Sequence, residues 1–217
     1  MQDYTVLDIE TDGLIENVTK IHCLSYAKYA KGKLLEKGTL TDYDQMKELL
    51  LQDNLEICGH NIVRYDVPVL EKLLGIKITA RLIDSLALSW YLYPMKKKHG
   101  LEQWGDELGV KKPEIEDWTN LKIADYIHRC ESDVKINSLL FSKQKTYLIH
   151  IYGTDEIKIN NLINYLVFKL DCAREQEEVG CKINLSLVNE SLQELYSLRD
   201  EKLRNLIEAM PKSITYK

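Results

Sequence analysis

The chain has 217 residues, of which 45% are hydrophobic and 29% are charged, proportions that are typical of a globular protein with one main domain. Its formal net charge of -5 argues against a basic protein that coats duplex DNA by neutralising phosphates. No apolar run approaches the roughly 20 residues needed to cross a bilayer, so we expect no membrane association.

The cysteines and the amino-terminal residues both favour an intracellular protein. Five cysteines are an odd number, and none forms a CxxC pair, which disfavours a disulfide framework and a zinc site. The first residues, MQDYTVLDIETDGL, contain neither the basic nor the apolar stretch of a secretory signal. We therefore expect a reducing, cytoplasmic location.

Hydrophobic patterning predicts an α/β fold. Gly32 marks a hairpin turn, Pro68 fits the first turn of a helix, and Gly75 ends that helix. The predicted strands cover 4–9, 20–29, 33–40 and 56–61, the predicted helices cover 42–51 and 67–75, and 80–94 begins as a strand or helix and continues as a helix. Strands followed by alternating helices and strands are typical of an α/β layer architecture.

The second half of the chain is predicted to be mainly helical. A polar, lysine-rich segment contains a short helix near 100–108, a long helix covers about 121–149, and the remainder reads as almost wholly helical. We therefore expect an α/β domain over 1–150 and a helical extension over 151–217.

The most informative motif is a pair of acids, Asp8 and Glu10, at the end of the first strand. Residues two apart in an extended chain point to the same side, so both carboxylates share one face. Adjacent carboxylates repel each other unless a cation or a proton neutralises them, and an oxygen-only site suits Mg²⁺ or Mn²⁺. Taken alone, the pair is also typical of two solvated acids at a strand end.

Two further acids occur in motifs downstream. Asp66 lies in GHNIVRYDVPVL directly before a predicted helix, where an acid can also be an ordinary cap or dipole partner. Asp133 lies in HRCESD on the long helix, and a buried acid there needs a partner or a metal ion. His128 is about 140° away from Asp133 around an ideal helix, so both reach one cleft only if His128 lies in a loosened first turn. A solvated surface histidine is the alternative.

Together these segments resemble the motifs of the DEDD 3′–5′ exonucleases. DIETDGL at 8–14 resembles the first motif, GHNIVRYDVPVL at 59–70 the second, and HRCESDV at 128–134 the third in its HxxxxD form. The sequence is most similar to the exonuclease domain of bacteriophage family A DNA polymerases. That similarity continues through IDSLALSW at 83–90, HGLEQWGDELG at 99–109 and KLDCAREQEEVGCKINLSLVNESLQEL at 169–195.

The resemblance implies an α/β fold of the RNase H-like type, a mixed sheet flanked by helices. The domain over 1–150 would be the 3′–5′ exonuclease. The helical extension over 151–217 would resemble the connector that leads into a polymerase thumb.

Carried over residue by residue, the resemblance implies four catalytic, metal-binding carboxylates: Asp8, Glu10, Asp66 and Asp133. They would hold two divalent cations, Mg²⁺ or Mn²⁺, and His128 would be the general base. Those polymerases usually have a tyrosine four residues before the last acid, where this chain has Arg129. Tyr126 is the alternative base. The implied reaction is hydrolysis of single-stranded DNA from its 3′ end to nucleoside 5′-monophosphates, as in proofreading.

An unpaired 3′ end needs contacts that do not depend on base sequence, from stacking surfaces and from cations along the backbone. The candidates beside the bases, the terminal sugar or its phosphate are Thr11, Leu14, Asn61 and Tyr65. The candidates for backbone contacts are Lys96, Lys97 and Lys98, although a lysine run is also typical of a solvated loop.

Two other functions stay open at this point. One is an exonuclease of the same superfamily that trims RNA 3′ ends, and the other is a catalytically silent module that binds nucleic acid or protein. The chain could be a fragment of a polymerase or a free-standing exonuclease, so a polymerase domain on the same or another chain is a possible partner. A phage origin would place it in the cytoplasm of a bacterial host cell.

Overall fold

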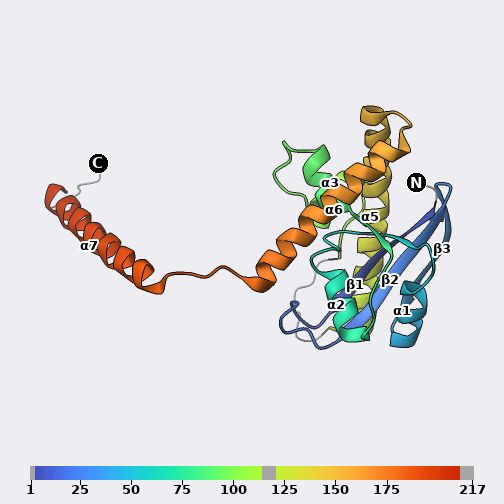
Figure 1. Cartoon of the computed structure of the whole chain (residues 1–217), viewed down its shortest axis with the longest axis horizontal. Coiled ribbons are helices and arrows are strands. Elements are labelled where there is room, and N and C mark those ends of the chain that lie inside the picture. Colours follow the sequence, from blue (N-terminus) through green and yellow to red (C-terminus); the bar gives the residue numbers. More distant parts are fainter. Residues whose placement is uncertain (1–2, 114–120, 211–217) are drawn as a thin grey trace, which may run out of the picture. The chain divides into compact units, whose positions relative to one another are not determined.

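The computed structural model describes residues 3–113 and 121–210, and its elements follow the predicted order (Figure 1). The strands are β1 (Asp3–Thr11), β2 (Ile21–Ala30), β3 (Lys33–Leu40), β4 (Glu56–Gly59) and β5 (Arg81–Asp84). The helices are α1 (Tyr43–Leu50), α2 (Asp66–Leu74), α3 (Ser85–Leu92), α4 (Leu101–Leu108), α5 (Ile123–Tyr152), α6 (Glu156–Val179) and α7 (Leu185–Ala209).

The strands form one mixed sheet in the order β3-β2-β1-β4-β5, which confirms the predicted mixed sheet. β1 pairs antiparallel with β2 and parallel with β4, and β4 pairs parallel with β5. The carboxyl ends of β1, β4 and β5 therefore meet at one edge of the sheet. The predicted strand over 56–61 ends earlier, at Gly59, because Asn61 adopts the left-handed conformation with φ 69°.

Side-chain alternation along β1 separates the two faces of the sheet. Leu7 and Ile9 pack with the buried residues of α1 and α2, whereas Tyr4 and Val6 pack with those of α3, α5 and α6. Because residues two apart share a face, Asp8 belongs to the face that α5 covers. The same periodicity that buries the core thus directs this acid beneath the long helix.

Helix α5 is held against its neighbours by close packing. Trp104 on α4 is 1% exposed and packs with Ile136 and Leu140 on α5. At Gly105 a Cβ atom would lie 2.4 Å from the backbone oxygen of Val110 and 2.9 Å from Ile136. Only glycine leaves room for this close approach between α4 and α5.

The elements up to Glu175 form one compact unit, and the residues from Gln176 onward form another. The domain limit expected at residue 150 falls inside α5, which continues to Tyr152. The first part of α6 belongs to the first unit, since Ile163 and Leu170 lie in its cores. None of the described helices has a segment long and apolar enough to cross a membrane.

Candidate active site

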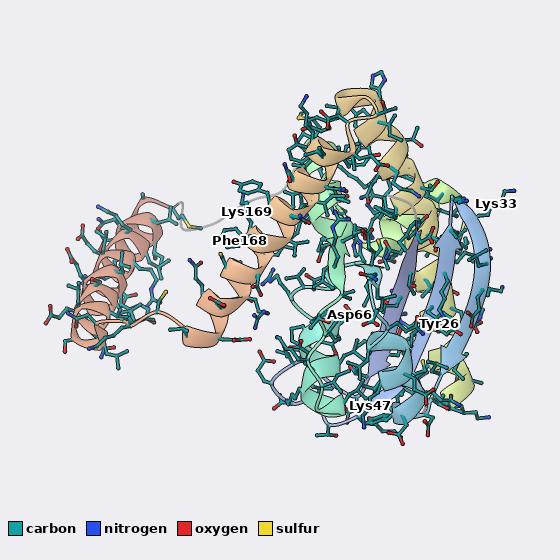
Figure 2. The ribbon with its side chains drawn as sticks, turned by 45° about the vertical axis from the view of Figure 1, so that its right-hand side comes forward. Tyr26, Lys33, Lys47, Asp66, Phe168 and Lys169 are labelled. Carbon is teal, nitrogen blue, oxygen red and sulfur yellow. The ribbon has the colours of Figure 1, made fainter. Side chains whose placement is uncertain are left out.

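Three of the predicted acids converge at the carboxyl edge of the sheet. Asp8 and Glu10 on β1 and Asp133 on α5 each place one carboxylate oxygen within 4.8 Å of the other two. Asp66, the fourth, is the first residue of α2 and is 4% exposed; Figure 2 labels it at the beginning of that helix. Segments distant in sequence thus bring their acids to one place.

Burial and mutual repulsion disfavour ionisation of these acids. Burial raises the pKa of Asp8 well above its usual range, and the neighbouring Cys130, Asp133 and Asp66 raise it further. Burial also raises the pKa of Asp66 to about 7, although hydrogen bonds from backbone N–H groups oppose the rise. A cation bound among these groups would relieve the repulsion and favour the ionised forms.

Two cationic side chains already contact the acids. The Arg129 Nε lies 3.1 Å from Glu10 Oε1, and Lys112 pairs with Asp133 Oδ2. Burial raises the pKa of Glu10 to about 7, although the Arg129 charge lowers it. Asp133 Oδ1 is buried and has no hydrogen-bond partner in the described part of the chain. An unpaired buried carboxylate oxygen is costly, so this atom fits a ligand for a cation.

His128 does not lie with the four acids. Its exposed side chain lines a cavity of about 510 Å³ between α5 and the strands β2 and β3, together with Ser25, Tyr26 and Glu131. None of the four acids lines that cavity. Because α5 begins at Ile123, His128 lies in a regular turn, and its direction is about 140° from that of Asp133.

Arg129 takes the place at the acids that the sequence suggested for His128. Residues four apart on a helix are neighbours on one face, so Arg129 and Asp133 both face β1. The alternative base, Tyr126, stacks on His22 with ring centroids 4.0 Å apart. Sequence reasoning noted Arg129 only as a departure from the resembled motif and assigned it no role.

Hydrogen bonds connect the turn after β1 to Tyr65, the residue directly before α2. Thr11 Oγ1 donates to the Gly13 carbonyl at 3.1 Å, and the Tyr65 hydroxyl donates to the same oxygen at 2.6 Å. The Thr11 and Tyr65 hydroxyls also contact each other. Tyr65 therefore positions the turn, and Leu14 on it is 71% exposed.

Asp84, which the sequence analysis did not single out, organises the loop between β4 and α2. Its carboxylate accepts hydrogen bonds from the N–H groups of Asn61 and Val63, both at 3.3 Å. It also caps α3, accepting from Leu86 N at 2.9 Å and Ala87 N at 3.1 Å. Asp84 thereby fixes Asn61 at the carboxyl edge of the sheet. Its signal in the sequence is an acid directly before a predicted helix.

The predicted lysine run divides into two kinds of residue. The Lys96 Nζ pairs with Glu107 and lies 4.3 Å from the centroid of a Trp104 ring, so this side chain is occupied within the fold. Lys97 and Lys98 are exposed in the segment between α3 and α4. The same segment contains His99, which lies close enough to His60, directly after β4, to influence the pKa of that histidine.

The comparisons with known proteins place part of the sequence beside phage polymerases. No protein-family model matches the chain. An alignment 139 residues long, which covers 52% of the chain, is 31% identical to the DNA-directed DNA polymerase of Enterobacteria phage T3. A match of 142 residues to the DNA-directed DNA polymerase of Escherichia phage T7 is also 31% identical. Each match spans 20% of the polymerase.

The fold resembles solved nucleases over most of its length. Brucella melitensis NrnC has a TM-score of 0.59 and 18% sequence identity, and the alignment covers 83% of this chain and 89% of NrnC. E. coli Exonuclease I in complex with dT13 has a TM-score of 0.53 and 12% identity, over 70% of this chain and 43% of that protein. NrnC has also been solved with bound Mg²⁺. These likenesses confirm the predicted RNase H-like fold of the DEDD 3′–5′ exonucleases.

The half-buried histidine directly after β4 makes stability depend on pH. Burial lowers the pKa of His60 to about 4, and the charges of Lys112 and His99 contribute to the lowering. An unfolded histidine titrates near 6.5, so below that pH the unfolded chain takes up a proton that the folded chain refuses. We predict that His60 alone removes about 2 kcal/mol of stability between pH 7 and pH 5.

Urea denaturation at pH 7 and pH 5 measures this loss. The His60→Asn variant should lose about 2 kcal/mol less than the parent chain over that interval. His150→Asn, a change at an exposed histidine near the end of α5, should behave like the parent. An equal loss in the parent and in His60→Asn would contradict the assignment.

Proposed function

We propose that the chain is a metal-dependent 3′–5′ exonuclease that hydrolyses single-stranded DNA to nucleoside 5′-monophosphates. The observation that carries the proposal is the convergence of Asp8, Glu10 and Asp133 to within 4.8 Å, with Asp66 beside them. Crowded carboxylates are costly in the absence of cations, and a fold that keeps them together gives a divalent cation a ready site.

The donor set fits a divalent cation that prefers oxygen. The four groups offer carboxylate oxygens alone, which favours Mg²⁺ or Mn²⁺ over a metal that selects sulfur or imidazole. The unpartnered Oδ1 of Asp133 supports this fit. When bound, two such ions would polarise the scissile phosphate and stabilise the charge on the attacking and leaving oxygens.

The side chains around the acids have separate proposed roles. The four carboxylates hold the cations, and Tyr65 positions the turn that carries Thr11 and Leu14 beside the terminal nucleotide. Asn61, which Asp84 fixes, would contact the terminal sugar or phosphate. His128 receives no role in proton transfer, since its side chain lines the cavity between α5, β2 and β3.

The choice of DNA as substrate is supported by the relatives. The 31% identical segments belong to DNA polymerases, and the E. coli Exonuclease I structure contains dT13. We propose that the chain removes 3′ nucleotides in a proofreading role, with a polymerase domain on the same or another chain as its partner. Residues 151–217 would then be the connector toward that domain.

RNA is the second candidate substrate. The alignment with NrnC covers more of this chain than the alignment with Exonuclease I, and NrnC has been solved bound to pGG. The 2′-hydroxyl is the group by which a protein distinguishes RNA from DNA, so matched DNA and RNA oligonucleotides separate the two candidates. A cytoplasmic location is proposed for either, since the five cysteines are free thiols, as a reducing compartment keeps them.

The Asp8→Asn variant tests the activity. We predict that it lowers turnover of single-stranded DNA by more than about 100-fold, because even residues that only support a metal ligand are typically worth 10–100-fold. Asp3→Asn, at the other end of β1, should keep the parent rate. The far-ultraviolet circular dichroism spectrum should be unchanged in both.

The substrate's label shows the direction of hydrolysis. DNA labelled at its 5′ end should give a ladder in Mg²⁺, and DNA labelled at its 3′ end should release labelled mononucleotide first. Unchanged turnover in Asp8→Asn would contradict the assignment of the site. Absence of any divalent-dependent cleavage in the parent chain would favour a silent binding module, and faster cleavage of RNA would favour the second candidate.

The exposed lysines in the segment between α3 and α4 are predicted to contact the DNA backbone. Each phosphate contact on a single strand contributes about 0.7 to the slope of log affinity against log salt. Changing Lys97 and Lys98 to glutamine should therefore lower that slope by about 1.4. The measurement is fluorescence anisotropy of labelled DNA at several salt concentrations, with the Asp8→Asn background preventing cleavage.

The turn between β2 and β3 provides a matched control. Ala30 pairs with Asp3, at the end of β1 away from Glu10, so the adjacent Lys31 and Lys33 lie far from the carboxyl edge of the sheet. Figure 2 shows the Lys33 side chain projecting away from Asp66. Glutamine at these two positions should leave the slope unchanged. If both double variants give the same slope of log affinity against log salt, Lys97 and Lys98 are solvated loop residues that do not contact the DNA.

A further inference from the structure

Two positively charged side chains form ion pairs with the carboxylate cluster. Lys112, from the segment after α4, pairs with Asp133, and the carboxylate side chain in this pair is 5% exposed. Arg129, on α5, pairs with Glu10, with side chains 19% and 13% exposed. Ion pairs this far from water are not the weak pairs of a protein surface, because solvent screens them little.

The two cations divide the acids into two kinds. Glu10 and Asp133 each have a cationic neighbour that lowers the pKa of the carboxyl. The charged neighbours that act most strongly on Asp8 and Asp66 are themselves acids, and they raise the pKa of both. The uncompensated charge therefore lies with Asp8 and Asp66.

The formal charges of the four proposed ligand carboxylates, Lys112 and Arg129 indicate how many divalent cations these groups can neutralise. When a cation is bound, the four carboxylates proposed as its ligands are ionised and contribute four negative charges, and Lys112 and Arg129 contribute two positive ones. Two negative charges remain, which one divalent cation neutralises. A second divalent cation would leave a net positive charge in a buried place, unless it displaced a resident cation or arrived with an anion.

The identity of the residue at position 129 matters for this count. A guanidinium group stays protonated in proteins, and it has no hydrogen-bond acceptor atom. Arg129 is further held by its Nη1, which donates to the Pro113 carbonyl at 3.3 Å. It is therefore a fixed positive charge beside Glu10 and cannot take a proton from an attacking water.

We propose that Lys112 and Arg129 take the place of a second divalent cation in the substrate-free site. The free chain then binds one divalent cation, held by Asp8 and Asp66 with the unpartnered Oδ1 of Asp133. The second enters only with the substrate, whose phosphate brings negative charge. This rests on the proposed function, and it makes Lys112 and Arg129 positioning residues that set how many ions the site accepts.

Isothermal titration of the full chain with Mn²⁺, without nucleic acid, tests the proposal. The parent should bind one Mn²⁺. The double variant Lys112→Gln with Arg129→Gln should bind two, and it should bind the first at least about 10-fold more tightly, because two unit charges a few ångströms away are removed. Electron paramagnetic resonance of free Mn²⁺ gives the same count independently.

Conservative variants separate charge from packing. Arg129→Lys and Lys112→Arg keep the charge and should keep the parent stoichiometry. Lys135→Gln, at an exposed position on the same helix, should bind Mn²⁺ as the parent does. If the charge-removing and the charge-keeping variants bind the same number of Mn²⁺ ions, the proposal is overturned.

The outcomes also distinguish this proposal from the proposed function. If the parent chain binds two Mn²⁺ without nucleic acid and still degrades DNA, the role proposed for Lys112 and Arg129 is overturned, but the proposed function is not. Mn²⁺ binding that Asp8→Asn leaves unchanged, or no binding in any variant, would overturn the metal site itself and this proposal with it.

Discussion

Electrostatic repulsion among buried carboxylates is the constraint on which this structure depends. Burial raises the pKa of Asp8, Glu10, Asp66 and Asp133, so the folded state disfavours their ionised forms. Here the acids stay together, and the cations of Lys112 and Arg129 offset only part of their charge.

The sheet topology explains how acids from three segments meet. The parallel pairing of β1, β4 and β5 brings three carboxyl ends to one edge, and α2 begins just beyond the end of β4. The alternation of β1 turns Asp8 toward α5, and α5 brings Asp133 close to it. Gly105 allows α4 to approach Ile136 on the same helix. Asp84 and Tyr65 then hold the two loops at that edge with hydrogen bonds.

Much of the fold could be predicted from sequence, because it rests on local periodicity. The alternation of β1 predicted that its two acids share a face, and the apolar patterns placed most helices within a few residues. The direction of His128 depends on where α5 starts. The residue before Ile123 is a lysine, which is not a preferred N-cap residue, so the number of regular turns before His128 was not predictable. The contacts of Lys112 and Arg129 are tertiary, and no spacing in the chain encodes them.

Diffraction from crystals soaked in Mn²⁺, recorded to give its anomalous signal, tests the central claim most directly. The account predicts an anomalous peak within bonding distance of carboxylate oxygens of Asp8 and Asp66, and its loss in Asp8→Asn crystals. A chain that cleaves DNA while its bound Mn²⁺ lies elsewhere, away from all four acids, would contradict it.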